Sequence, residues 1–303
     1  MFRKTSLFNY LLLVAAIFGF DAWGRTVPNR QDMPDALVPV RFVPAKFDPS
    51  SFAPLRLAGV WKVEVADARF GGISALAVDQ DSLVALTDSG TVVRLPRPGR
   101  DGPAFLHDLP AGPGSARFKS SRDSEALARD PAGRGWWVAF ENWHQLWLFD
   151  PAFRTALRRI DLGKSRWHHN RGVEAMIAET QGLLLFPESG REWLELRGRR
   201  LSVRRLPNRF GDVADATRLA DGRLLLVTRE FGLAGMTKHL LIAERGRDGA
   251  MNLRRLAGLG LGRFDNVEAI ATEPRAGGTR LWLMTDNDFR ARAPTYLVAL
   301  DLP

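Results

Sequence analysis

Acidic residues recur at equivalent places along this chain. Five segments each begin with a polar residue followed by alanine and an apolar run, and this polar position is held by Ser74, Glu125, Glu174, Asp215 and Glu268. A second apolar run in each segment ends on another acid: Asp88, Glu141, Glu188, Glu230 and Asp286. Carboxylates that a fold gathers together bind a hard cation through oxygen or are neutralised by arginine. The pattern therefore predicts a cation site or a set of ion pairs.

We predict two overlapping sets of functional acids from this pattern. The expected catalytic acids are Glu125, Glu174, Asp215 and Glu268. The expected cation ligands are Glu125, Glu174, Glu268, Asp88 and Asp286, with Ca²⁺ as the expected cation. An architectural role stays open for the same acids, in which they fix turns, accept backbone N–H bonds and pair with nearby arginines.

Histidines and basic residues lie close to the same repeated positions. His168 and His169 are expected to make acid–base or phosphate contacts, although a loop histidine bonded to solvent or backbone is the alternative. Neighbouring residues of a strand point to opposite faces, so the two histidines do not easily serve one metal ion. The residues expected to hold an anionic substrate are Lys119, Arg122, Arg171 and Arg229. A solvated rim or ion pairing between repeats is the alternative for these cations.

The spacing of the segments predicts the elements that must position these residues. Successive segments are 41 to 53 residues apart, and each contains two apolar runs followed by further strand-like runs. A period of this length with a few short strands per unit is typical of a β-propeller blade. We predict an all-β propeller, most simply with six blades, the sixth combining residues 55–66 with the C-terminal strand. A large β-sandwich is the alternative, but it would not explain the repeat.

The repeated motifs resemble those of the esterase-like phytase family, also called phytase-like domain proteins, over roughly residues 59–302. The resemblance rests on Gly71-Gly72-Ile73-Ser74-Ala75-Leu76, Asp123-Ser124-Glu125-Ala126-Leu127, Gly172-Val173-Glu174-Ala175 and Asp265-Asn266-Val267-Glu268-Ala269-Ile270. It implies a β-propeller, export from the cytoplasm, and a distant relation to enzymes that use calcium to hydrolyse phosphomonoesters. The chain carries no copy of the Asp-Asp-Pro and Asp-Leu-Asp-Gly motifs associated with those enzymes.

The N-terminal part of the chain predicts export and an extended strap. Residues 1–24 combine a basic start, an apolar stretch of about 14 residues and the small residues Ala22 and Gly24, as in a cleaved signal peptide. A membrane anchor facing the periplasm is the alternative to a periplasmic or secreted product. Six prolines in residues 25–56 exclude a helix there, so this segment is expected to form a strap that supplies an edge strand. The propeller is expected over residues 57–303.

Composition limits the chemistry and the partners. The chain has no cysteine, which excludes disulfides, thiol nucleophiles and cysteine-ligated metal sites. No Gly-x-Ser-x-Gly elbow is present, so serine-esterase chemistry is unsupported. The net charge is +9, and an arginine-rich run at 191–209 is expected either to contact an anionic membrane surface or to form a solvated hairpin. No recognition motif predicts a nucleic-acid partner.

Two functions from different classes follow from the sequence. The first is an exported, metal-dependent hydrolase of an anionic small molecule, a phosphomonoester or a related ester, with a divalent cation held by carboxylates of the channel. The second is a non-catalytic propeller that binds a ligand or a protein outside the cytoplasm.

Overall fold

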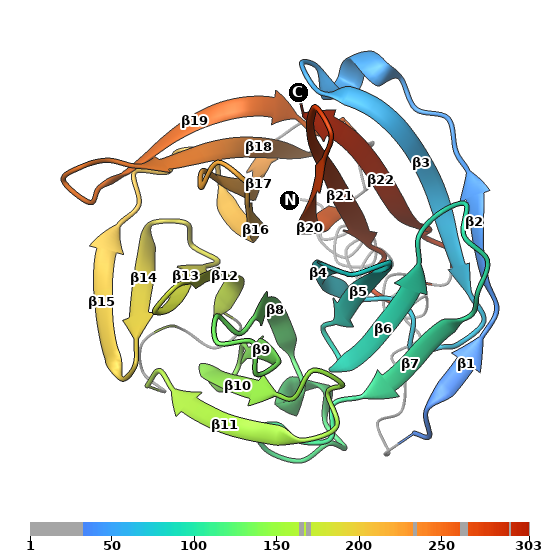
Figure 1. Cartoon of the computed structure of the whole chain (residues 1–303), viewed down its shortest axis with the longest axis horizontal. Helices are drawn as coiled ribbons and strands as arrows, with labels where there is room; N and C mark the ends of the chain where they lie inside the picture. The colour runs from blue at the N-terminus through green and yellow to red at the C-terminus, as the bar shows by residue number, and fades with distance from the viewer. Residues whose placement is uncertain are drawn as a thin grey trace, which may run out of the picture.

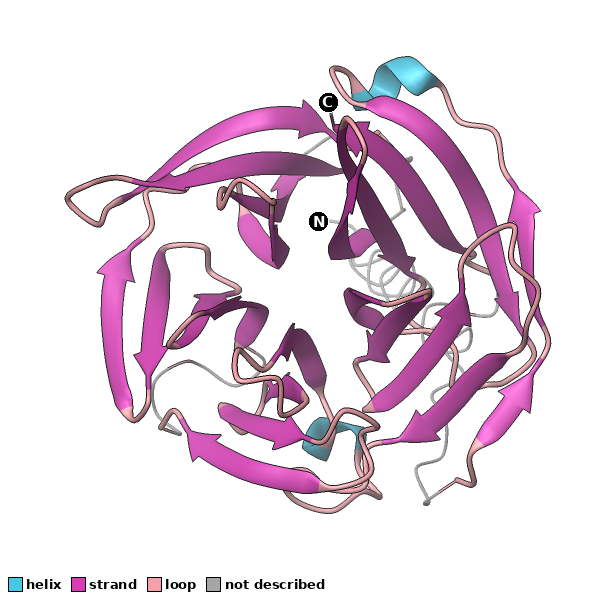
Figure 2. Cartoon of the chain, in the orientation of Figure 1, coloured by secondary structure: helices cyan, strands magenta, loops and turns pink. Residues whose placement is uncertain are grey.

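Five antiparallel sheets surround a central channel in the computed structural model, which describes residues 33–163, 167, 171–232, 235–260, 266–290 and 292–302 (Figures 1 and 2). Each sheet is one blade of a propeller, with one strand beside the channel and the other strands arranged outward. The all-β propeller predicted from the repeats is therefore confirmed. Among the described residues, no helix is long and apolar enough to cross a membrane.

The first three blades follow one another along the chain. Blade 1 contains, from the channel outward, β4 (Ile73–Asp79), β5 (Ser82–Thr87), β6 (Thr91–Pro96), β7 (Ala104–Asp108) and β1 (Ala36–Val38). Blade 2 contains β8 (Ser124–Arg129), β9 (Trp136–Phe140), β10 (Gln145–Phe149) and β11 (Ala156–Asp161). Blade 3 contains β12 (Val173–Glu179), β13 (Gly182–Pro187), β14 (Glu192–Arg197) and β15 (Arg200–Arg205).

The last two blades and two short 3₁₀ helices complete the described structure. Blade 4 contains β16 (Asp212–Arg218), β17 (Leu224–Gly232), β18 (Gly235–Arg245) and β19 (Met251–Gly258). Blade 5 contains β20 (Asn266–Arg275), β21 (Gly278–Asp286), β22 (Thr295–Leu302), β3 (Arg56–Val65) and β2 (Val40–Pro44). The 3₁₀ helices are η1 (Pro49–Phe52) and η2 (Lys119–Ser121).

The predicted sixth blade is wrong, because the residues assigned to it complete blade 5. β22 pairs with β21, and β3 pairs with β22 in turn, so that Val60 lies opposite Val298. The strands β20 and β21 need outer neighbours, and the two ends of the chain supply them. The expectation that both ends of the chain share one sheet is confirmed, and this pairing closes the ring (Figure 1).

The segment before β3 lies along the outside of two blades. β1 pairs with β7 at the outer edge of blade 1, and β2 pairs with β3 at the outer edge of blade 5. Only Pro39 separates β1 from β2. Pairing of this kind covers strand edges that would otherwise offer unpaired backbone groups to other chains.

Apolar clusters fill the boundaries between neighbouring blades, and each of the five boundaries has its own cluster. β13 shows how the sequence produces this arrangement. Its Leu183 and Leu185 pack toward blade 2, whereas Leu184 and Phe186 pack toward blade 4. Alternate side chains of a strand point to opposite faces, so a blade buried on both faces needs an unbroken apolar run.

The arginine-rich segment forms the outer hairpin of blade 3, made by β14 and β15. Arg197 forms an ion pair with Glu195, and the guanidinium of Arg204 lies over the ring of Trp193. Arg200, Arg204 and Arg205 are exposed at this outer edge. Exposed charge on an edge strand also discourages pairing between molecules.

Candidate cation-binding site at the channel mouth

Every innermost strand has a β-bulge near its start, and in four of the five strands the extra residue lines the cavity at the channel mouth. In β12, Val173 lies opposite Pro187 and Ala175 lies opposite Phe186, which leaves Glu174 as the extra residue. The same register shift occurs in all five innermost strands, and the extra residues are Ser74, Glu125, Glu174, Ala214 and Glu268. A bulge bends the strand and redirects the side chain that it carries. Three of the five redirected side chains are glutamates.

A second set of residues lies at the same mouth, where the neighbouring strand of each blade ends. The backbone N–H of Glu141 donates to the carbonyl of Asp123 at 2.8 Å, which extends the β8–β9 pairing by one residue. The equivalent position in the five blades is occupied by Asp88, Glu141, Glu188, Arg229 and Asp286. Antiparallel pairing therefore places two side-chain positions per blade at one end of the channel.

In the fourth repeat, the residues predicted from the sequence to be equivalent to those of the other blades are wrong by one position. The extra residue of the bulge in β16 is Ala214, not Asp215, and the paired position is Arg229, not Glu230. A shift of one residue turns a side chain to the other face of a strand. Asp215 accordingly does not line the cavity at the mouth. Its two oxygens accept hydrogen bonds of 2.7 Å from the backbone N–H groups of Ala216 and Ile270.

Asp215 therefore joins blade 4 to blade 5, and its removal tests that role. Asp215→Ala would leave two backbone donors without an acceptor, at a cost of about 1–3 kcal/mol for each buried donor. We expect a fall of several degrees in melting temperature and a lower free energy of unfolding in urea. Asp215→Asn keeps one acceptor oxygen and should cause a smaller loss. An unchanged stability combined with lost Ca²⁺ binding would instead identify Asp215 as a ligand.

The cavity at the mouth has a volume of about 170 Å³ and a lining dominated by acids. Seven carboxylates line it: Asp88, Glu125, Glu141, Glu174, Glu188, Glu268 and Asp286. Arg229 is the one basic side chain in the lining, and Ser74, at the bulge of blade 1, is its uncharged polar residue. The acids outnumber the cations of the wall, so the cavity favours an added positive charge.

Two groups of carboxylates have the spacing that a metal ion requires. One oxygen from each of Asp123, Glu125 and Glu141 lies within 4.8 Å of the others. The same holds for Glu141, Glu174 and Glu188, so Glu141 belongs to both groups. These acidic groups could hold a metal ion, and an all-oxygen donor set suits hard cations such as Ca²⁺.

Two side chains of the protein already neutralise part of this charge. Arg229 forms ion pairs with Glu188, at 3.2 Å, and with Glu268. Lys119 lies at the rim, 3.0 Å from an oxygen of Asp88 and 2.7 Å from an oxygen of Asp123. These contacts leave the middle of the acidic set, around Glu141 and Glu174, without a direct cationic partner among the described residues.

Unpaired polar atoms also point to a ligand at this mouth. Oδ1 of Asp88 and Nε of Arg229 are buried and have no hydrogen-bond partner among the described residues. Buried polar groups in folded proteins are normally satisfied, so each of these atoms needs an explanation such as a bound ion or water.

Burial and mutual repulsion raise the pKa values of these acids. Burial is the main cause for Asp286 and Glu141, whose pKa values rise to about 8, and for Asp88, whose pKa rises to about 6. Burial also raises the pKa values of Glu125 and Glu174 well above the usual range of glutamate, and neighbouring carboxylates add to the effect. Except for Asp88, these acids therefore retain protons near neutral pH unless a cation compensates them.

The other predicted site residues lie in different surroundings. Arg122 is buried and donates to the carbonyls of Pro113 and Ser121, so it holds a loop and does not line the cavity. Arg171 is 53% exposed at the rim, with its Nε 3.8 Å from Glu188. His168, His169 and the segment 1–24 lie outside the residues that the structure describes.

Asp123 is a candidate site residue that the sequence analysis did not predict. It belongs to one of the two possible metal groups and accepts hydrogen bonds from Lys119, at 2.7 Å, and from Asn142, at 2.6 Å. In the sequence, Asp123 lies two residues before Glu125, the repeated acid of blade 2. The repeat pattern did not single out this position, because the equivalent residues of blades 1 and 3 are Gly72 and Gly172.

Fold and site together define a five-bladed β-propeller whose channel mouth is built as a cluster of carboxylates. The chain belongs to the phytase-like family, whose model carries the description "esterase-like activity of phytase" and matches residues 68–289. No curated protein matches the chain.

Solved structures resemble this chain in fold. Glutaminyl cyclase from Myxococcus xanthus is 12% identical with a TM-score of 0.53, over 82% of this chain and 97% of that chain. The catalytic domain of the GH62 α-L-arabinofuranosidase from Coprinopsis cinerea is 14% identical with a TM-score of 0.51, over 77% of this chain and 93% of that chain. At such low identity the likeness extends to the fold alone.

Proposed function

We propose that the channel mouth binds a divalent cation, Ca²⁺ in the first instance, and that the protein hydrolyses a phosphomonoester or a related ester there. The observation that carries this proposal is the pair of carboxylate groups that share Glu141, each with its oxygens within 4.8 Å of one another. Membership of the phytase-like family supports the choice of ester hydrolysis. The expected location of the protein remains periplasmic or secreted, with contact of the arginine-rich hairpin to an anionic membrane surface as a further expectation.

Different residues at the channel mouth would bind the cation and the substrate in such a reaction. Asp123, Glu125, Glu141, Glu174 and Glu188 would hold the cation or cations. A bound divalent cation polarises a phosphoryl or carbonyl oxygen and lowers the pKa of a coordinated water. Lys119 and Arg229 lie on opposite sides of this group and can bind the anionic oxygens of a substrate.

Asp286 is the best placed proton donor. It lines the same cavity but belongs to neither metal group, and burial is the main cause that raises its pKa to about 8 in the metal-free protein. A general acid works best when its pKa lies close to the working pH. Asp286 would therefore protonate the leaving oxygen, while Arg229 and Lys119 hold the substrate in place.

The test is hydrolysis by purified protein that has been stripped with EDTA and then supplied with Ca²⁺, Mg²⁺ or Mn²⁺. p-Nitrophenyl phosphate, p-nitrophenyl acetate and phytate separate phosphomonoester from carboxylic ester chemistry. We expect cation-dependent release of phosphate or nitrophenol, and its loss in Asp286→Asn with Ca²⁺ binding retained. Tight Ca²⁺ binding with no turnover of any substrate would favour the non-catalytic ligand-binding propeller.

A further inference from the structure

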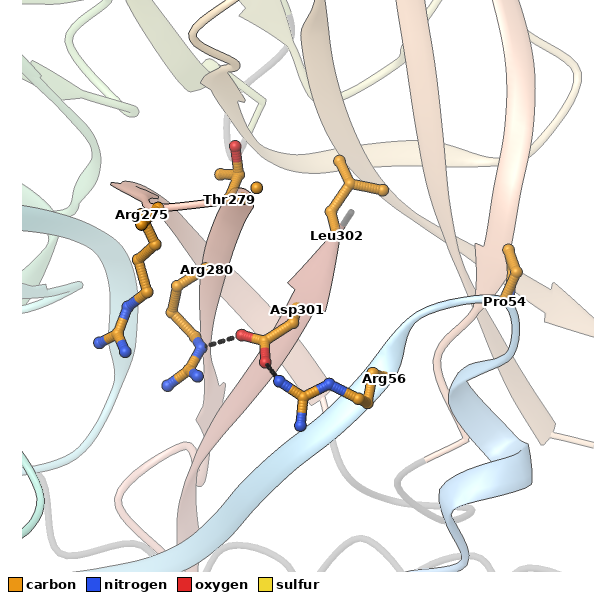
Figure 3. A pocket seen from close by; sticks show the side chains of 10 residues that line it. Pro54, Arg56, Arg275, Thr279, Arg280, Asp301 and Leu302 are labelled. Atoms are coloured by element: carbon orange, nitrogen blue, oxygen red, sulfur yellow. Dashed lines mark hydrogen bonds and ion pairs between the residues drawn. The ribbon is translucent and has the colours of Figure 1, made fainter.

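A second cavity lies at the opposite end of blade 5, on the other face of the propeller. It has a volume of about 430 Å³ and lies beside the β20–β21 hairpin, the start of β3 and the end of β22 (Figure 3). Glu268 and Arg275 are seven residues apart on β20, which corresponds to roughly 23 Å along a strand. This cavity is therefore separate from the acidic mouth, and its volume falls within the range of small-molecule sites.

Three arginines and a single acid line this second cavity. Arg56, Asp301 and Arg280 are direct neighbours across β3, β22 and β21. The carboxylate of Asp301 accepts hydrogen bonds from both arginines, as the dashed lines in Figure 3 show. Arg275 is the third arginine, and its guanidinium extends in the same direction beside that of Arg280 (Figure 3).

The acids near this cavity do not balance its positive charge. Asp301 is shared between two guanidinium groups. Glu273 contacts Arg275 at 3.3 Å, but it also pairs with Arg97 and accepts a hydrogen bond from Trp282. The lining itself thus carries three positive charges against one negative charge.

Donor groups of these arginines remain available to a ligand. The Arg280 side chain is only 14% exposed and uses its Nε for Asp301. Its two terminal nitrogens have no hydrogen-bond partner among the described residues, and Arg275 uses only one terminal nitrogen. Thr279 and the backbone of Gly277 and Gly278 complete the wall beside them.

We propose that this three-arginine cavity binds a dianionic tetrahedral oxyanion, the phosphate group of a phosphomonoester. The net charge of the lining matches a dianion, and the planar guanidinium fork binds two oxygens of a phosphate at once. The cavity is larger than a phosphate group and leaves room for the organic part of the ester. The inference does not depend on cation binding or hydrolysis at the acidic mouth.

The test is titration calorimetry with inorganic phosphate and with glycerol phosphate in the presence of EDTA, which removes any contribution from a metal at the other face. Arg275→Gln should weaken binding by about tenfold or more, since it removes a charged donor. Arg56→Gln is a second variant at a more exposed position. Asp301→Asn removes the competing carboxylate and should tighten binding several-fold.

Arg223→Gln is the matched control, because Arg223 also lies at the turn between the two innermost strands of a blade, but in blade 4, where it pairs with Asp221. Its phosphate affinity should equal that of the wild type. Vesicles with phosphatidic acid, compared with phosphatidylcholine, show whether a lipid headgroup or a free phosphomonoester is the preferred source of the phosphate. Equal affinity in Arg275→Gln, Arg56→Gln and the wild type would overturn the proposal. No more heat from phosphate than from chloride at equal ionic strength would do the same.

Discussion

Glu141→Gln is expected to abolish most of the stabilisation that Ca²⁺ gives to this protein. Glu141 belongs to both groups of carboxylates at the channel mouth, so its replacement removes one ligand charge from each. We expect a loss of affinity on the order of 100-fold, which corresponds to about 2.8 kcal/mol. The shift in melting temperature on addition of Ca²⁺ should therefore nearly vanish, and calorimetry should report the weaker binding directly.

The metal-free form of the Glu141→Gln variant provides the internal control. Removing one of several crowded carboxylates relieves repulsion, so the melting temperature in EDTA should stay the same or rise. Glu174→Gln should behave similarly but more mildly, because Glu174 belongs to only one of the groups. Glu179→Gln is the matched control variant. Glu179 lies at the opposite end of β12, the strand that carries Glu174, and pairs with Arg218. A lower melting temperature in EDTA with the Ca²⁺ shift intact would show that Glu141 is structural.

The second large effect is a loss of stability of the metal-free protein as the pH rises from 6.5 to 8. Asp286 and Glu141 have folded-state pKa values of about 8, against ordinary values near 4. Between these values the folded protein binds more protons than the unfolded chain, so the free energy of unfolding falls with rising pH. Each such group contributes up to about 1.4 kcal/mol per pH unit. We expect a fall of about 3 kcal/mol, or about 5 °C or more in melting temperature.

The chosen window separates this effect from other titrations. His107 and His239 have pKa values lowered by burial, so they add stability as the pH rises through about 6.5, the ordinary pKa of histidine, and oppose the acids only in the lower part of the window. Asp130, whose pKa is lowered to about 2, has lost its proton in both states well below this window. Excess Ca²⁺ should abolish or reverse the slope. A melting temperature in EDTA that rises between pH 6.5 and 8 would contradict the prediction.

The sequence pattern predicted the propeller and most of the acidic mouth because repetition reveals equivalent positions directly. Glu125, Glu174 and Glu268 share a register in sequence, and the structure gives each of them the same bulge. The fourth repeat was misaligned because Val213-Ala214-Asp215-Ala216 offers two registers of nearly equal quality. A bulge is a property of strand pairing, so the sequence of one strand alone does not locate it.

The blade count could not be predicted for a different reason. The outer strands of blade 5 come from opposite ends of the chain, and their pairing depends on contacts between residues more than 230 positions apart, such as Val60 and Val298. Local pattern identifies such strands but not their partners. The three-arginine cavity depends on the same long-range pairing, because Arg56 meets Asp301 only when the ring is closed.

The strap formed by β1 and β2 also has a consequence for the order in which the molecule assembles. β3 cannot pair with its inner neighbour β22 until the end of the chain has been synthesised. Contacts between residues so far apart in the sequence also form slowly. β1, however, can pair with β7 as soon as blade 1 exists. Since only Pro39 separates β1 from β2, the β2–β3 hairpin is then tethered at the rim of the first blade. We expect the strap to keep β2 and β3 paired beside the first blade. The pairing of β22 with β3 would then be the final step of folding.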